Sequence, residues 1–547
     1  MYLRQVAANL SRRTLFLTQT INTSYHGIPP NSLPMKAKIS DKYGSGNSGS
    51  RINQRDSYLW TIVAGQAAII LGMYANPAFA HASTESSTET ELGGADKIGL
   101  RKIEDGSIIS NIHTKKWRIF TDSGREYFLQ GKLDQAEKFF ISAIEEAKEG
   151  FGNRDPHVAS ACNNLAELHR VRKAFEKAEP LYLEAINILE ESFGPEDIRV
   201  GAAFHNLGLF HLVRRKLEEA RKCYERALKI KRRVLGLGHT DYADTMYHLG
   251  TVLYLQGKEK DAEALVQDSI QILEEAGQGE SATCIRRLRY LSQMYLRSNR
   301  LPEAENVQRR ILHVMELSKG WDSLETVIAA ERLAQTLQAA GSLKEARELL
   351  GRCLNIQKRI LPEDHSKICA TMLQIARVAI LNANRLREAH ISEATAELDN
   401  ARDLLYNSVR VARQVLNRLR NQYSSSQKNG ASQEIRREGH ATLILLLQSL
   451  DTLGHLAITK QELQDSMEEH LSTIEAENAL LQCIAAYKEF KTEKIISVSP
   501  EVKMEYVSCL KCLSSLIGDD AIKERELHNL HDEIKHIESE ISGFKKR

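Results

Sequence analysis

A spacing of 42 residues recurs through the middle of this chain and constrains its fold more than any other feature. Small residues stand at this interval, with Ala376 as a seventh member of the series: Gly124, Ala166, Gly208, Gly250, Ser292 and Ala334. Twelve residues after each of the first six stands an alanine, and sixteen residues after each of the first three stands an aromatic residue. A period of roughly 20–50 residues is typical of a solenoid, whose units bury their apolar faces only against neighbouring units.

Each repeat has the pattern of two helices joined by a short turn. A small residue followed three positions later by an aromatic one, as in Gly124 and Tyr127, marks one face of the first helix. A polar break such as Gln256–Lys258 follows, and the second helix then carries a small residue and a larger one, as in Ala220 and Tyr224. Small residues let two antiparallel helices approach closely, and the larger residue fills the gap against the next unit. The pattern therefore predicts an all-α fold.

The run Leu207–His211, followed by Ala220, Tyr224 and Ala227, resembles the tetratricopeptide repeat. The unit of 42 residues, with a tail such as RRVLGLGHTDYADTMYHLG at 232–250, is similar to the repeats of kinesin light chains. The resemblance covers roughly residues 109–420, or about seven repeats, and implies a right-handed superhelical solenoid. We expect a degenerate repeat and capping helices over residues 433–547.

The N-terminal residues 1–57 have the composition of an organelle presequence and are expected to be disordered. Met1–Ser40 contains no Asp or Glu, is rich in Ser and Thr, and includes Arg4, Arg12 and Arg13. A basic, acid-poor segment of this kind is typical of targeting to a mitochondrion or plastid, and the early arginines favour the mitochondrion. A disordered basic tail without a targeting role is the alternative.

Residues 58–75 contain no charge and are just long enough to cross a bilayer as a single transmembrane helix. Arg51 and Arg55 precede this segment and several glutamates follow it, which favours the N-terminal side in the matrix and the repeats in the intermembrane space. Residues 76–108 read as a flexible linker. The expected location is thus the mitochondrial inner membrane, with a plastid thylakoid membrane or lumen as the alternative. Cleavage after Ala80, or burial of the apolar segment in a soluble protein, stays open.

Composition and motifs give no indication of catalysis. The formal net charge of +2 is too small to predict nucleic-acid binding, and the phosphate-loop, nucleophile-elbow and zinc-helix motifs are missing from the sequence. The pair Cys509 and Cys512 lacks the second pair that a zinc site of this type needs, so the eight cysteines are expected to be buried, unreactive thiols. We therefore expect no enzyme activity, metal, cofactor or small-molecule substrate.

The resemblance implies that the first helix of each repeat lines a concave groove. Matching the groove positions to this chain gives Asn163, Asn164, Glu167, Arg170, His205, Asn206, Tyr247, His248, Tyr254, Arg289, Tyr290, Gln293, Arg297, Arg332 and Gln335. Asn side chains can hold an extended peptide backbone, and Tyr and Arg supply apolar area and carboxylate recognition. Arg289, Arg297 and Arg332 are the candidates to face an acidic client, and a solvated helix face is the alternative for each position.

These observations predict a membrane-tethered adaptor that holds a client protein or peptide during the assembly or turnover of a larger complex. A cytosolic cargo adaptor of the kinesin-light-chain type is the alternative. It predicts that the first 80 residues stay uncleaved. A third hypothesis is an enzyme, whose active-site residues would have to be far apart in the sequence and come together only in the folded protein.

Overall fold

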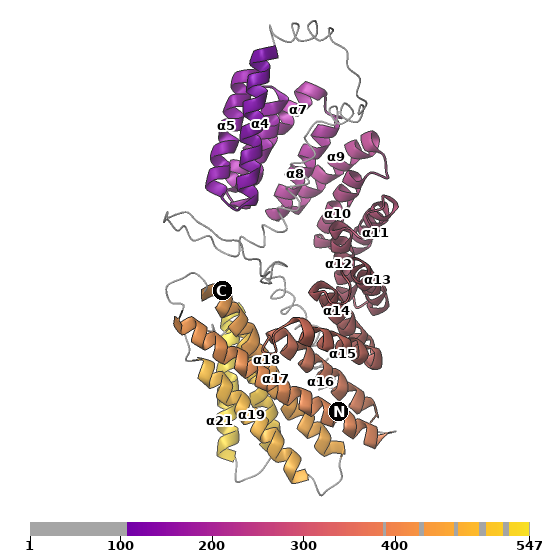
Figure 1. Cartoon of the computed structure of the whole chain (residues 1–547), viewed down its shortest axis with the longest axis vertical. Helices are drawn as coiled ribbons and strands as arrows, with labels where there is room; N and C mark the ends of the chain where they lie inside the picture. The colour runs from indigo at the N-terminus through magenta and orange to yellow at the C-terminus, as the bar shows by residue number, and fades with distance from the viewer. Residues whose placement is uncertain are drawn as a thin grey trace, which may run out of the picture. The chain divides into compact units, whose positions relative to one another are not determined.

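The computed structural model describes residues 107–386, 390–425, 432–463, 469–491, 499–517 and 524–545, and the regular structure within these ranges is entirely α-helical (Figure 1). The expected all-α fold is therefore confirmed. The predicted presequence and the predicted membrane span at 58–75 lie outside the described residues and stay predictions.

Seven helical hairpins follow one another in the described chain, and from the second to the seventh their first helices begin 42 residues apart. They are α4 (Ser107–Leu129) with α5 (Leu133–Phe151), α6 (Pro156–Val171) with α7 (Phe175–Phe193), α8 (Ile198–Val213) with α9 (Leu217–Leu235), α10 (Thr240–Leu255) with α11 (Glu259–Glu275), α12 (Ala282–Arg297) with α13 (Leu301–Lys319), α14 (Leu324–Ala340) with α15 (Leu343–Ile360), and α16 (Ser366–Leu386) with α17 (Ile391–Ser425). Each pair corresponds to one repeat of the sequence pattern.

In two repeats the small residue packs directly against the large residue sixteen positions later. A Cβ atom added to Gly124 would lie 2.6 Å from the ring of Phe140, and one added to Gly208 would lie 2.9 Å from the ring of Tyr224. Both distances are too short for a real side chain, so glycine is required at these two contacts. The large residue sixteen positions later fills the space that the missing side chain leaves.

A capping residue at the same 42-residue interval sets where the first helix of a repeat begins. Side chains of Asp155, Asp197, His239, Ser323 and His365 each accept a hydrogen bond from the backbone N–H two residues later, at 2.8–3.2 Å. Ser281, in the same register, accepts from the N–H of Cys284 at 3.1 Å. Such caps satisfy backbone donors that have no partner inside the helix. This second periodic signal was missed by the sequence analysis.

The described chain divides into two compact units, with the boundary between Leu291 and Ser292 inside α12. In the unit that ends at Leu291, the core is formed by alanines and larger apolar residues of successive hairpins, including Tyr182, Phe210 and Ile230. The other unit holds α13 to α17 and four C-terminal helices: α18 (Ser432–Leu463), α19 (Glu469–Lys491), α20 (Pro500–Ile517) and α21 (Glu524–Lys545).

Among the described helices, one segment is long and apolar enough to cross a membrane, Ile435–Gln461 of α18. It is mostly buried in the protein, where α18 packs against α17, α19 and α20. Gly454 allows close packing here, because an added Cβ would lie 2.9 Å from Leu480 of α19. The apolar character of this segment is therefore accounted for by the core of the C-terminal helices.

The turn between the helices of a hairpin provides a stability test. Gly341 ends α14 in the left-handed conformation, with φ of 86° and open space around its Cα. We expect Gly341→Ala to lower the free energy of unfolding by about 1 kcal/mol, because a Cβ disfavours this conformation. Gly351 lies inside α15, also with open space, so the matched control Gly351→Ala should raise that free energy by about 0.5–1 kcal/mol. Denaturant unfolding followed by circular dichroism measures both, and stabilisation by both variants would contradict this conformational assignment.

Candidate protein-binding site

The first helices of neighbouring repeats meet through residues that stand 43 positions apart and are alike in kind. Asn206 on α8 donates from Nδ2 to Oδ1 of Asn163 on α6, at 2.9 Å. One repeat further on, the rings of His205 and His248 are in edge contact with centroids 5.2 Å apart.

The next step in this series is made by tyrosines. The rings of Tyr247 on α10 and Tyr290 on α12 lie edge to face, with centroids 5.6 Å apart. In all three pairs, the residue three positions before one small residue meets the residue two positions before the next. We call this series of pairs, Asn163–Asn206, His205–His248 and Tyr247–Tyr290, the inner ladder.

At the N-terminal end of the inner ladder, α6 carries a buried ion pair. Arg170 donates from Nε to Glu167 at 2.9 Å, and Tyr182 on α7 donates to the same carboxylate at 2.8 Å. Burial alone raises the pKa of Glu167, but the charge of Arg170 and these hydrogen bonds outweigh it and leave the pKa lowered. The carboxylate is therefore ionised and fully engaged inside the protein.

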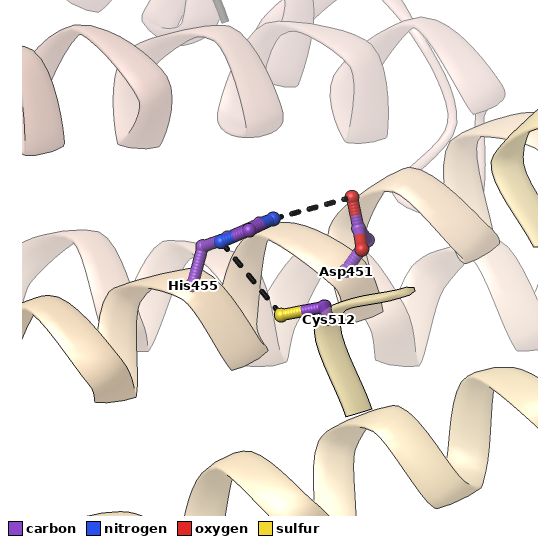
Figure 2. A group of neighbouring side chains, drawn as sticks. All are labelled: Asp451, His455 and Cys512. Atoms are coloured by element: carbon purple, nitrogen blue, oxygen red, sulfur yellow. Dashed lines mark hydrogen bonds and ion pairs between the residues drawn. The ribbon is translucent and has the colours of Figure 1, made fainter. Parts of the chain in front are cut away.

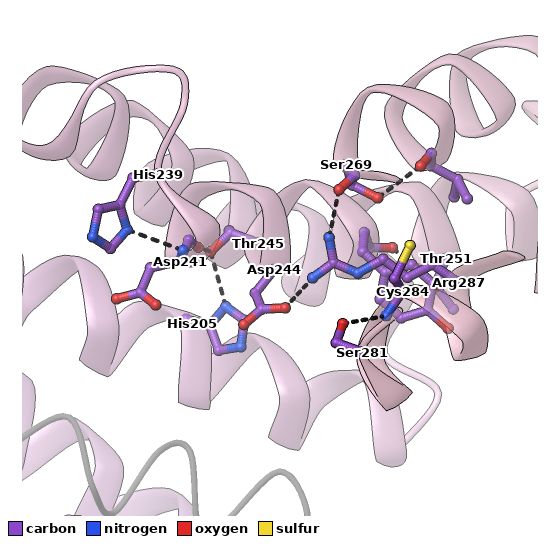
Figure 3. Close-up of polar contacts among 12 residues, drawn as sticks. His205, His239, Asp241, Asp244, Thr245, Thr251, Ser269, Ser281, Cys284 and Arg287 are labelled. Atoms are coloured by element: carbon purple, nitrogen blue, oxygen red, sulfur yellow. Dashed lines mark hydrogen bonds and ion pairs between the residues drawn. The ribbon is translucent and has the colours of Figure 1, made fainter. Parts of the chain in front are cut away.

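The middle of the inner ladder is held by polar contacts between α8, α10 and α12 (Figure 3). His205 Nδ1 lies 3.0 Å from Thr245 Oγ1, whose hydroxyl donates to the Asp241 carbonyl at 3.1 Å. Because the hydroxyl proton is used in this way, the His205 ring donates through Nδ1. On the other side of α10, Asp244 pairs with Arg287 of α12, which also donates to the Ser269 carbonyl at 2.8 Å.

The two histidines of the inner ladder are held neutral by burial and by neighbouring cations. Burial, followed by the charges of Arg287, Arg286, Lys231 and Arg170, lowers the pKa of His248 to about 3. Burial, Lys231 and His248 lower the pKa of His205 well below its usual value. The surroundings of His248 therefore disfavour a positive charge on its ring.

Burial sorts the predicted groove residues into three sets. Side chains of the first set are buried: Asn163, Asn164, Glu167, Arg170, His205 and Asn206. A second set is partly exposed: Tyr247, His248, Tyr254, Arg289, Tyr290, Arg332 and Gln335. Gln293 and Arg297 are exposed.

The predicted groove residues are divided between the two units. Gln293, Arg297, Arg332 and Gln335 belong to the second unit, and the other eleven belong to the unit that ends at Leu291. Within the first unit, Asn164 Nδ2 is buried without a hydrogen-bond partner among the described residues. The assignment of all these residues to a peptide-binding groove stays a prediction.

The sequence did not predict four residues around the inner ladder: Asp244, Thr245 and Arg287, which make contacts between its helices, and Lys231, whose charge lowers the pKa of His205. Thr245 and Arg287 stand five positions before the small residue of their repeats, and Asp244 stands six before. Extending the comparison of repeats by three positions would have included them. Lys231 lies near the end of a second helix, and the period gives no signal for its role.

Residues 123–191 and 199–275 match one family model of the tetratricopeptide repeat, and residues 326–366 match another. With the hairpins described above, these matches define an all-α array of tetratricopeptide repeats, a class of scaffold for protein–protein interaction. The resemblance to this repeat is thus confirmed. A search among curated proteins found no match.

Three solved structures are similar to parts of this chain. Nearly identical TPR-like repeats of a Podosopora anserina protein described as a kinesin light chain match with 19% identity and a TM-score of 0.34, over 37% of this chain and 96% of that one. BtubC (BKLC) from P. vanneervenii matches with 19% identity and a TM-score of 0.37, over 42% and 92%. The apo form of RapI matches with 12% identity and a TM-score of 0.41, over 75% and 99%. These likenesses concern the fold alone.

The depressed pKa values of the ladder histidines predict how stability depends on pH. As the pH falls below about 6.5, the unfolded chain binds protons at these histidines whereas the folded protein does not, so stability is lost progressively toward a pH of about 3. Between about pH 7 and pH 5, His248→Gln should reduce this loss by about 1–2 kcal/mol relative to the unaltered protein.

Urea unfolding at several pH values measures this difference. The matched control is His528→Gln, because the side chain of His528 on α21 is 78% exposed. An equal effect of the two substitutions on the pH dependence would contradict the assignment of His248 as a neutral ring.

Proposed function

We propose that this protein is a non-catalytic, membrane-tethered scaffold of an organelle. In this proposal, the tetratricopeptide repeats hold a client polypeptide during the assembly or turnover of a larger complex. Support for client binding comes from the repeats and from partly exposed tyrosines on α10 and α12. Support for the location comes from the composition of residues 1–57 and from the uncharged segment 58–75.

The observation that carries the binding proposal is a cluster of three tyrosines on α10 and α12. The ring of Tyr290 lies edge to face against Tyr247, with centroids 5.6 Å apart, and against Tyr254 at 6.0 Å. All three side chains are partly exposed, in contrast to the buried residues of α6 and α8. Tyrosine offers a large contact area with few rotatable bonds, and it is enriched among residues that dominate binding energy.

Charge around this tyrosine cluster favours a client with acidic side chains. The guanidinium of Arg287 lies 5.4 Å from the centre of the Tyr247 ring, and Arg286 is partly exposed next to it in the chain. Asp244 offsets the charge of Arg287, whereas Arg286 and Lys231 both help to lower the pKa of His248. A peptide that places a carboxylate beside an apolar or aromatic residue fits this combination best.

Contacts between α8, α10 and α12 would hold the tyrosine cluster in place before a client binds. The inner ladder and the Asp244–Arg287 pair fix α8, α10 and the first part of α12 against one another before any client arrives. A rigid arrangement reduces the conformational entropy that is lost on binding. The polar residues of α6 and α8 then act in positioning, and direct contact with the client falls to α10 and α12.

Site-specific photo-crosslinking tests this assignment. A photo-crosslinking phenylalanine analogue replaces Tyr254, or as a matched control Tyr406 of α17, whose side chain is 49% exposed. In the intact organelle, we expect the analogue at position 254 to form crosslinks to one discrete partner. The crosslinking yield at the control position should be at least about tenfold lower, because one patch carries most of the binding energy. Equal yields at the two positions, or none at position 254, would rule out the tyrosine cluster as the binding site.

Proximity labelling combined with protease protection tests the location. The full chain should label proteins of the intermembrane space, and deletion of residues 1–57 should leave it in the cytosol. Import of the truncated chain would disprove a presequence in these residues. Association of the full chain with microtubule motors would support the cytosolic adaptor instead.

A further inference from the structure

A cluster of three potential metal ligands lies between α18 and α20, within the unit that holds the C-terminal helices. Asp451 and His455 stand four residues apart on α18, so they project from the same side of that helix. Cys512 of α20 faces them (Figure 2). One ligand atom from each residue can be chosen so that all three lie within 4.8 Å of one another.

The chemistry of this cluster is that of a binding site for zinc or a similar ion. Cys512 Sγ lies 3.7 Å from His455 Nδ1. Zinc bonds of about 2.0 Å to nitrogen and about 2.3 Å to sulfur in a tetrahedral arrangement place those two atoms about 3.5 Å apart. His455 Nε2 lies 3.9 Å from Asp451 Oδ2.

The Asp451 carboxylate gives an independent indication that something is bound here. Asp451 is only 7% exposed, and its Oδ1 is buried without a hydrogen-bond partner among the described residues. Its Oδ2 accepts a hydrogen bond from the Ser508 hydroxyl at 2.9 Å. A buried carboxylate oxygen without a partner is costly, and a bound cation removes that cost.

The neighbouring cysteines explain why Cys512 is available as a ligand. Cys509 is joined to Cys483 in a disulfide, which corrects the expectation that all eight cysteines are thiols. Cys512 remains a free thiol. The C-x-x-C pair thus does not provide two ligands from one helix. The partners of Cys512 come instead from α18.

We propose that Asp451, His455 and Cys512 bind one zinc-class divalent ion, with Cys512 Sγ, a ring nitrogen of His455 and a carboxylate oxygen of Asp451 as ligands. Three protein ligands leave a fourth position for water or for an external ligand. The His455 side chain is 27% exposed, so solvent reaches this end of the site. The Ser508 hydroxyl orients the carboxylate from outside the ligand set.

Cobalt titration of the purified full chain, after removal of metal with a chelator, tests this proposal. Co²⁺ serves as a coloured substitute for zinc, and coordination by sulfur gives a near-ultraviolet charge-transfer band. We expect one Co²⁺ per chain with this band, and displacement of the Co²⁺ by Zn²⁺. Cys512→Ser should abolish the band, and Ser508→Ala should weaken affinity by about 10–100-fold while leaving the band in place.

The matched control is Cys369→Ser, which replaces another buried free thiol of the same unit and should leave the titration unchanged. Circular dichroism verifies that each variant is folded. If Cys512→Ser fails to fold, Ser508→Ala and His455→Ala carry the test through their lowered affinity. Failure of the folded, unaltered protein to take up stoichiometric Co²⁺ would overturn the proposal, as would persistence of the band in folded Cys512→Ser or its loss in folded Cys369→Ser.

Discussion

The structure depends on the close approach of two helices at one small residue in each repeat. A single hairpin cannot cover its own apolar face, so it is stable only against neighbouring hairpins. At Gly124 and Gly208 the approach leaves no room for a side chain, and the rings of Phe140 and Tyr224 occupy the space. With this contact fixed, positions two and three before the small residue fall where successive first helices meet.

Those positions in the unit that ends at Leu291 carry the inner ladder. A buried Asn pair, a His pair and a Tyr pair follow one another, so the contact between first helices changes from polar to aromatic along the chain. Buried polar groups are costly unless they are paired, which makes each step specific for its partner. The same geometry therefore gives rigidity at α6 and α8 and a partly exposed tyrosine cluster at α10 and α12.

The sequence predicted the repeats well because their period, small residues and turns are all local signals. It predicted helices over residues 433–547, but periodicity could not place α19, whose apolar residues are spread around the helix instead of lying along one stripe. It also placed Asn163, Glu167 and Arg170 in a groove without indicating that they are buried in contact with one another or with neighbouring helices. Periodicity gives the face on which a residue lies, but its exposure depends on how closely the neighbouring repeat packs.

The cluster of Asp451, His455 and Cys512 shows the same limit at longer range. The spacing of Asp451 and His455 is visible in the sequence, but the arrival of Cys512 from α20 depends on how the C-terminal helices pack. That part of the chain has lost the 42-residue register. In that part of the chain, the spacing of residues in the sequence therefore does not show which ligands from different helices come together.

The central claim is that the first helices form the rigid, buried interior of the repeat unit, with their polar residues engaged. Amide hydrogen exchange of the full chain, resolved helix by helix, measures this most directly. The account predicts that the amides of α6 and α8 exchange at least about tenfold more slowly than those of α7 and α9, the second helices of the same hairpins. Equal exchange in the two sets, or faster exchange in α6 and α8, would contradict it.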